Sequence, residues 1–587
     1  MNQKEQFKIE IMEPRGVLAH PEREGLSNPR LTDLNGKTIA LLQLYGSRNA
    51  PLQGSKLFFD IFEEILKKRY PTAKTVRWKS FGAPNSVINA DEIAASCDCW
   101  VEGVKDAITQ GRKDCAVYME RAGKPGVAIC SEVLLRAKKE LQDLNGMPAA
   151  RLVTVPATDF CTAKRNYEKM YPVVEAVFDD IVKALTTPLT EEEKRSYIKE
   201  YDYSDKTFTG DTYTQAYEKF FDYCAENALS DGLPVIPPTR EAVEWMLTGT
   251  TYPRDKVIGL MYPKSGIATV EKIAISAVMA GAKPEWLPVI IGIVETFTAK
   301  DINQFHMVNE ILPLIFISGP IIKELGLNNK IGYLAPGHRI NSTIGRALLM
   351  CMINIGWRDM TIYSSPGGFG QPAAYANYFI VENQDESPWE SWAEQNGYAP
   401  DESTITICEM NIMKRGPSEV ASDDTYEMRK NSVKEMFSWK SISAMPGKSA
   451  DFRHMLVLHP AFARQLADDG FTKQSFVQYL YDEGVLDYDS MTEAQREALK
   501  AEMDRLNEGR SMPMYNLRSS DIKPGLHREA FGDPANVMVM VAGTGAGNSI
   551  IFQTMAGSTG PNAEDVSVPR PFMTKVIHGA ALTKYGK

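Results

Sequence analysis

The first 185 residues alternate between strand-like and helix-like patterns, and no other feature of the sequence constrains the fold as strongly. Short apolar runs that end near Gly, Ser or Pro predict strands at 38–45, 73–84, 90–99, 124–132 and 150–159. Apolar residues at helical spacing predict helices at 55–70 and 100–113. Strands that alternate with helices form parallel sheets covered on both faces, so we predict a doubly wound, Rossmann- or flavodoxin-like α/β domain.

The remainder of the chain is expected to be α/β as well, with a strand order that the sequence does not define. Apolar segments such as LPLIFIS, ANYFIVEN, STITICEMN and ANVMVMV predict strands, and the segment GAKPE separates two apolar helices. No tandem repeat is visible. We predict an N-terminal domain, a charged linker and a larger α/β region with two lobes, at 1–188, 189–210 and 211–587 (211–450 and 451–587).

The composition is that of a water-soluble globular protein. Of the 587 residues, 43% are hydrophobic and 24% are charged, and the net charge is −10. A negative charge without a basic patch argues against a nucleic-acid partner. No apolar run approaches the roughly 20 residues that cross a bilayer, and the first residues, MNQKEQFKIEIMEPRG, lack the apolar core of a signal peptide. We therefore expect a cytoplasmic protein that does not bind membranes, acts on a small molecule and forms homo-oligomers.

Polar and thiol-bearing side chains follow the expected strands. The strand ends read GSRN, SFGAP, SCDC, CSE and PATD, and three of the eight cysteines fall there: Cys97, Cys99 and Cys130. Ligands of parallel sheets bind outside the carboxyl ends of the strands. The sequence therefore predicts a site at this edge, where Ser47 and Arg48 of the first strand end bind the substrate.

Cys97 and Cys99 are the expected reactive pair. They come directly before the helix predicted at 100–113, and a helix N-terminus lowers the pKa of a thiol. Of two close thiols, one can attack a substrate and the other can resolve the adduct. Two other interpretations stay open. In the first, the two cysteines are small buried residues of the core. In the second, they form part of a metal site with Cys130, although the sequence offers no further Cys or His at ligand spacing.

Several polar residues of the larger region are candidates for the same chemistry. Glu271 and Lys272 interrupt an apolar helix start and are a candidate acid–base pair. His306 and His338 lie in polar segments and are further candidate acids or bases, although a single His is more often a hydrogen-bonded structural residue.

A helix start in this region has the features of an anion site. Asn341, Ser342 and Thr343 lie at the expected N-terminus, and Arg346 follows one turn later. Backbone N–H groups and an arginine suit a carboxylate or a phosphate. An ordinary helix cap with a surface arginine is the alternative.

No cofactor is identified. The segment VAGTGAGNS (541–549) follows a strand, but it lacks the full G-x-G-x-x-G spacing and the acidic residue expected about 20 residues later at a strand end. We interpret it as a glycine turn near the active cleft. A resident metal ion is not favoured either.

The first region resembles the UGSC family of bacterial (seleno)proteins, which carry a selenocysteine or cysteine followed by Gly-Ser-Cys at a strand end. The resemblance runs through ADEIAASCDCWVEGVKDAI, GKPGVAI and ARLVTVP. An ungapped match places Cys99 on the final cysteine of the motif and Ser96 on its first position. Cys97 and Asp98 then replace Gly and Ser, so either Cys97 takes over as nucleophile or the family chemistry is altered here. The larger region is similar to a domain that accompanies UGSC proteins.

These features together predict a thiol-dependent oxidoreductase, lyase or transferase. We expect it to make or break a carbon–heteroatom bond, carbon–sulfur first, in a small anionic substrate. In this hypothesis Cys97 attacks, Cys99 resolves the adduct, and Asp98 or a histidine such as His306 moves protons. A metal-dependent lyase or hydrolase and a non-catalytic binding or assembly protein are the alternatives.

Overall fold

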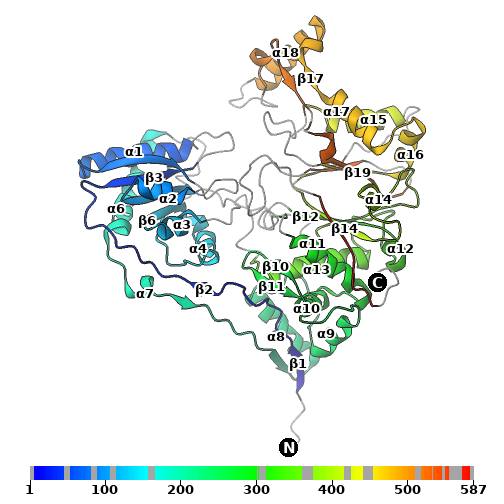
Figure 1. Cartoon of the computed structure of the whole chain (residues 1–587), viewed down its shortest axis with the longest axis horizontal. Helices are drawn as coiled ribbons and strands as arrows, with labels where there is room; N and C mark the ends of the chain where they lie inside the picture. Colours follow the sequence, from blue (N-terminus) through cyan, green and yellow to red (C-terminus); the bar gives the residue numbers. More distant parts are fainter. Residues whose placement is uncertain are drawn as a thin grey trace, which may run out of the picture.

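A computed structural model shows two bodies joined by extended chain segments (Figure 1). It describes residues 6–44, 53–80, 89–105, 114–156, 166–299, 302, 312–359, 375–410, 412–415, 425–440, 454–508, 517–529, 531, 533–544, 549–553 and 572–581. The smaller body, blue to cyan in Figure 1, contains the N-terminal sheet, and the larger one contains the green to red segments.

The smaller body is built on a five-stranded parallel sheet in the order β4-β3-β5-β6-β7. The strands are β3 (Thr38–Gln43), β4 (Lys74–Lys79), β5 (Cys99–Lys105), β6 (Gly126–Ser131) and β7 (Leu152–Val155). Numbered along the chain, this order is 2-1-3-4-5, the flavodoxin-like arrangement. The predicted doubly wound α/β fold is confirmed, and the strand order reverses between β3 and β5.

Helices cover both faces of this sheet. One face packs against α1 (Gln53–Arg69) and α6 (Tyr167–Thr186) through a cluster that includes Leu41 and Ile129. The other face packs against α2 (Ala90–Ala95) and α3 (Cys115–Arg121) through Leu42, Trp100 and Ala128, and α4 (Leu135–Leu144) lies at its carboxyl end. Side chains alternate between these faces along β3 and β6.

The segment 90–113 differs from the prediction. Residues 90–95 form α2 rather than a strand, and β5 occupies the start of the predicted helix. The alanines and the acidic first turn of α2 favour a helix. The prediction missed β5 because Glu102, a charged residue inside an apolar run, is more typical of an amphipathic helix.

The beginning of the chain belongs spatially to the larger body. There β1 (Phe7–Ile11) pairs with β9 (Lys206–Gly210), and Ile9 and Ile11 join its main core. The chain then crosses to the five-stranded sheet of the smaller body and later returns. The two crossing segments pair through β2 (Glu22–Arg23) and β8 (Tyr197–Ile198), near α7 (Glu191–Lys194) (Figure 1). The predicted boundaries at 188 and 211 therefore describe the return crossing only.

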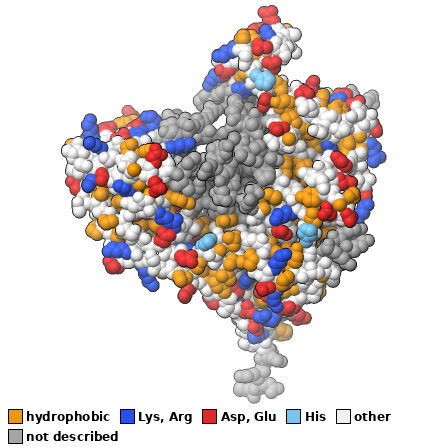
Figure 2. All heavy atoms as spheres, viewed as in Figure 1, with side chains coloured by type: hydrophobic (Ala, Val, Ile, Leu, Met, Phe, Trp, Pro, Cys, Tyr) orange, Lys and Arg blue, Asp and Glu red, His pale blue; other side chains and the backbone are white. Residues whose placement is uncertain are grey.

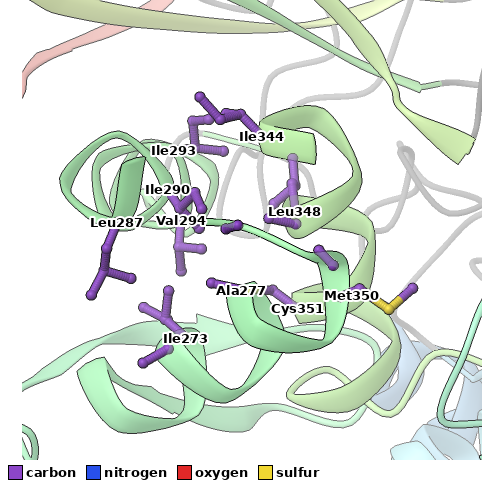
Figure 3. Packing of buried hydrophobic residues seen from close by; sticks show 14 of the residues in the cluster. Ile273, Ala277, Leu287, Ile290, Ile293, Val294, Ile344, Leu348, Met350 and Cys351 are labelled. Atoms are coloured by element: carbon purple, nitrogen blue, oxygen red, sulfur yellow. The ribbon is translucent and has the colours of Figure 1, made fainter. Parts of the chain in front are cut away.

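Three apolar helices form the core of the larger body. They are α10 (Val270–Ala280), α11 (Leu287–Phe297) and α13 (Arg339–Asn354). Figure 3 shows Ile273, Ala277, Ile290, Leu348 and other residues of these helices in mutual contact. Gly281 ends α10 in the left-handed conformation, with φ of 89°, which a residue without a side chain adopts at little cost. This turn is the predicted break at GAKPE.

Two four-stranded sheets follow, and they share one strand order that the sequence did not reveal. In each sheet a central strand lies between a parallel and an antiparallel neighbour, and a fourth antiparallel strand completes the sheet. The orders are β13-β12-β14-β21 and β19-β16-β20-β15. The strands are β12 (Leu312–Ser318), β13 (Tyr378–Val381), β14 (Thr404–Met410), β15 (Ile412–Arg415), β16 (His454–Leu458), β19 (Val537–Val541), β20 (Ile550–Gln553) and β21 (Met573–Val576).

The last strand of each set is exchanged between the two sheets. β15 directly follows β14 in the chain, yet it pairs with β20 of the second sheet, and β21 follows β20 but pairs with β14 of the first. The two predicted lobes are therefore interlocked. The facing sheets bury a cluster that includes Phe316, Met455 and Phe552, while helices cover the outer faces, which gives four layers.

The remaining elements surround these layers. The second sheet is covered by α15 (Thr425–Met436), α16 (Pro460–Asp468) and α17 (Lys473–Gly484). The others are α8 (Tyr213–Glu226), α9 (Arg240–Leu247), β10 (Val257–Met261), β11 (Gly266–Thr269), α12 (Ile321–Leu325), α14 (Trp392–Gln395), β17 (Leu486–Asp487), α18 (Glu493–Asn507) and β18 (His527–Arg528). Within the described ranges, no helix has the length and apolarity needed to cross a membrane. Figure 2 shows acidic and basic side chains interspersed over the visible face.

The exchange of β15 and β21 between the two sheets predicts which strands unfold together in local unfolding. In native-state hydrogen exchange at low denaturant, we expect amides of β15 to lose protection together with those of β20, because these strands share hydrogen bonds. Amides of β14 should instead open with those of β21. If β14 and β15 opened as one unit, as their adjacency in the chain suggests, the strand exchange would be contradicted.

Candidate active site

A buried cluster of charges lies around Glu102, the middle residue of β5, beside the carboxyl end of β4. Glu102 is fully buried, and one carboxylate oxygen accepts a hydrogen bond of 2.7 Å from Ser80 Oγ, which follows β4. The other carboxylate oxygen lies 3.4 Å from Lys138 Nζ of α4. Lys138 Nζ also donates to Asp114 Oδ2 at 2.5 Å. Two carboxylates and one ammonium thus meet in the interior at the edge where parallel sheets bind ligands.

Local contacts fix Asp114 and keep Lys138 charged in this cluster. Asp114 is the N-cap of α3, and its side chain accepts from the backbone N–H of Ala116 at 2.9 Å. Burial opposes the charge of Lys138, but the adjacent carboxylates of Asp114 and Glu102 outweigh it and raise the pKa of the ammonium. Lys138 is therefore a permanent cation at neutral pH.

The opposite face of the same edge carries unpaired hydrogen-bonding groups. Gln43 ends β3 and Ser131 ends β6, and their side chains are 2% and 0% exposed. Gln43 Nε2 and Ser131 Oγ have no hydrogen-bond partner among the described residues. Ser55, in the first turn of α1, donates to the Gly103 carbonyl at 2.5 Å and accepts from Leu44 N at 3.1 Å. This serine connects the start of α1 to β5 and to the end of β3.

Cys97 and Cys99 lie at the other end of the sheet, so their predicted place is wrong. Cys97 is in the loop before β5 and Cys99 is its first residue, which puts both at the amino edge and away from any helix N-terminus. Their side chains are 6% and 0% exposed. Burial raises the pKa of both thiols, and the Cys97 thiol donates to the Ile93 carbonyl. The geometry is that of two small core residues.

Asp98, between these cysteines, and Ser96, before them, also have structural contacts. Asp98 binds the start of β3 twice, through its backbone N–H to the Thr38 carbonyl and through its carboxylate to Thr38 N, each at 2.8 Å. Ser96 Oγ accepts from Trp78 Nε1 at 3.0 Å. An ungapped match of Ser96 and Cys99 to a motif at a strand end is therefore inconsistent with the position of this segment before β5.

Two other cysteines do lie near the carboxyl edge. Cys130 is the penultimate residue of β6, on the face that carries Glu102, and Cys115 begins α3 directly after Asp114. Both are fully buried. Of the three strand-end cysteines noted in the sequence, Cys130 alone occupies the predicted position.

The candidates from the larger region are not brought together. Arg254 binds the Glu271 carboxylate, while Lys272 Nζ donates to the Glu13 carbonyl at 2.5 Å, and burial lowers the Lys272 pKa. Arg346 forms a bidentate ion pair with Asp231, with both distances 2.8 Å.

The residues of the predicted anion site lie in the first turns of α13. Asn341 binds the backbone of Asn328 through both ends of its amide. Ser342 and Thr343 lie within the first turns of α13, and His338 precedes it without a side-chain capping bond. Ser47, Arg48 and His306 lie outside the described residues.

Comparison with known families identifies the N-terminal part. Residues 10–187 match the UGSC family, so this part of the chain is a UGSC family domain, followed by a larger C-terminal region. No curated protein and no solved structure matched the chain. In the described ranges, no three His, Cys, Asp or Glu side chains are grouped as metal ligands would be.

The burial of Cys97 and Cys99 predicts slow alkylation. Because their thiol pKa values are raised, the thiolate fraction is smaller than for a free cysteine at every pH below about 9. We expect iodoacetamide to label both at less than about one tenth of the rate seen in urea-unfolded protein at pH 7.5. Rapid labelling of the native protein with a midpoint below about 8.5 would instead restore the reactive-pair hypothesis.

Removal of Lys138 should destabilise the UGSC domain. Lys138→Met leaves Glu102 and Asp114 buried without a cation, and we expect a loss of about 3–5 kcal/mol in the free energy of unfolding, measured with urea. Lys68→Met, which breaks an exposed pair with Glu64, is the matched control and should cost less than about 1 kcal/mol. Equal losses in both variants would contradict the buried network.

Proposed function

We propose that the protein is an enzyme acting on a small anionic molecule at the carboxyl edge of the UGSC domain. The observation that carries this proposal is the buried cluster of Glu102, Lys138 and Asp114 beside the point where the strand order reverses. Buried charges are costly, and perturbed ionisable groups concentrate at functional sites. Ligands of open parallel sheets bind at this position.

The cluster supplies a base and a fixed positive charge. Glu102 is the candidate base, and Lys138 is the cation that stabilises negative charge developing on the substrate. In the reaction we favour, Glu102 takes a proton from a carbon atom and the C–H electron pair forms a double bond. The neighbouring carbon–heteroatom bond breaks, and its electron pair leaves with the heteroatom. This lyase-type step keeps the predicted bond type and requires no external oxidant.

A thiol-dependent reaction is the second candidate. Cys115 and Cys130 favour it, because both lie near the carboxyl edge and the charge of Lys138 interacts with Cys115. An adjacent ammonium favours a thiolate. Cys97 and Cys99 are not proposed again as the reacting pair. Homo-oligomeric assembly and a cytoplasmic location stay predictions.

The test is a substrate screen with paired variants. The full-length protein is incubated with a defined panel of small carboxylic acids that carry hydroxyl, amino or thioether groups, and products are identified by mass spectrometry. For a substrate that turns over, Glu102→Gln should lower kcat at least about 100-fold, because general-base catalysis contributes about 10²–10⁴. Lys138→Arg keeps the charge and should retain part of the activity.

Matched controls separate catalysis from folding. Glu64→Gln and Lys68→Arg make the same changes in an exposed pair of α1 and should leave kcat unchanged. Cys115→Ala and Cys130→Ala distinguish the thiol-dependent reaction, which either variant would stop. Folded Glu102→Gln protein with wild-type turnover would refute the assignment of the base.

A further inference from the structure

On the α1 face, the carboxyl edge presents the N-terminus of α1 and two buried side-chain donors that have no hydrogen-bond partner among the described residues. We propose that they form an oxyanion subsite, which binds a phosphate or carboxylate group of the ligand; this inference rests on the proposed function and assigns the ligand class. The donors are the first-turn N–H groups of α1, the amide of Gln43 and the hydroxyl of Ser131.

Helix α1 begins beside the carboxyl end of β3 and Gly103 of β5. Ser55 joins its first turn to Leu44 after β3 and to Gly103 of β5, the two strands between which the order reverses. The first turn contains no acidic residue, whereas the last turn contains Lys67, Lys68 and Arg69. The partial positive charge of a 17-residue helix is therefore not neutralised by its own side chains.

Gln43 and Ser131 flank β5 on the same face as α1. Gln43 lies two residues after Leu41, and Ser131 two residues after Ile129, and both apolar residues belong to the cluster that packs against α1 and α6. Gln43 pairs with Gly103 across β3 and β5, while β6 adjoins β5 on its other side. The two polar side chains therefore lie on either side of β5.

The unpaired donors need an acceptor. Gln43 Oε1 accepts from Arg77 at 3.4 Å, which leaves the Nε2 amino group without a partner among the described residues. Ser131 Oγ has none either. Leaving a buried donor unsatisfied costs free energy, so such groups call for a specific explanation. An oxyanion offers several acceptor lone pairs at once, and its charge is compatible with the helix N-terminus.

Arginine is not needed for this subsite. Arg77, which contacts Gln43, binds the carboxylates of Asp60 and Glu63 and is already neutralised. The donors named here are uncharged, so we expect them to select the oxyanion by geometry and the helix dipole. On the other face of the sheet, Glu102 and Lys138 are left to act on the part of the ligand that reacts.

The test uses inorganic phosphate and malonate as probes of the full-length protein at constant ionic strength. We expect saturable thermal stabilisation by at least one of them, with slower hydrogen exchange in residues 54–58. Gln43→Leu and Ser131→Ala should each weaken binding at least tenfold. Without the probe, Ser131→Ala should be as stable as wild type, because it removes an unsatisfied donor. Gln43→Leu should be nearly as stable, because it removes an unsatisfied donor together with one long contact from Arg77.

The control variants make the same kinds of substitution at a buried glutamine and a buried serine outside the proposed subsite. Gln142→Leu replaces another buried glutamine, in α4, whose side chain has no hydrogen-bond partner among the described residues. Ser276→Ala replaces a buried serine in α10. Both variants should bind the probes like wild type. Glu102→Gln should also keep probe binding, so loss of turnover and loss of the subsite are separable. Absence of saturable stabilisation, or stabilisation unchanged in Gln43→Leu and Ser131→Ala, would overturn the inference.

Discussion

The contact on which the UGSC domain depends is the ammonium of Lys138 between two buried carboxylates. It joins α4 to Asp114 at the start of α3 and to Glu102 in β5, so three elements share one charge network. None of these charges is stable in the interior without the others. The network therefore also fixes the positions of α3 and α4 relative to β5 at the carboxyl edge, where the candidate site lies.

The alternation of strands and helices could be predicted because it follows from local periodicity. β3, β4, β6 and β7 lie within the predicted segments, and the apolar runs of the larger body became β12, β13, β14 and β19. The secondary structure of residues 90–105 was predicted wrongly because Glu102 interrupts the apolar pattern of β5, a strand that is buried by tertiary contacts. The exchange of β15 and β21, and the pairing of β1 with β9, depend on contacts between distant segments, which local patterns do not encode.

The sequence predicts a site at the carboxyl edge, where the buried charge cluster lies, but it does not name the residues of that cluster. The rule that ligands bind beyond the carboxyl ends of parallel strands depends only on topology, which the sequence revealed. The cysteine pair was misplaced by one element, and this shift moved Cys97 and Cys99 to the opposite edge. The signal for the buried network was present in WVEGV, where one acidic residue lies within an apolar run, but its partner Lys138 comes from a helix 36 residues away.

A crystal structure of the full-length protein with bound phosphate, or with a small acid that stabilises it, tests the central claim most directly. We expect the ligand over the ends of β3 and β5, with its oxyanion within hydrogen-bonding distance of Gln43 or Ser131 and its remainder toward Glu102 and Lys138. A ligand held at the amino edge beside Cys97 and Cys99 would contradict the assignment of the functional edge.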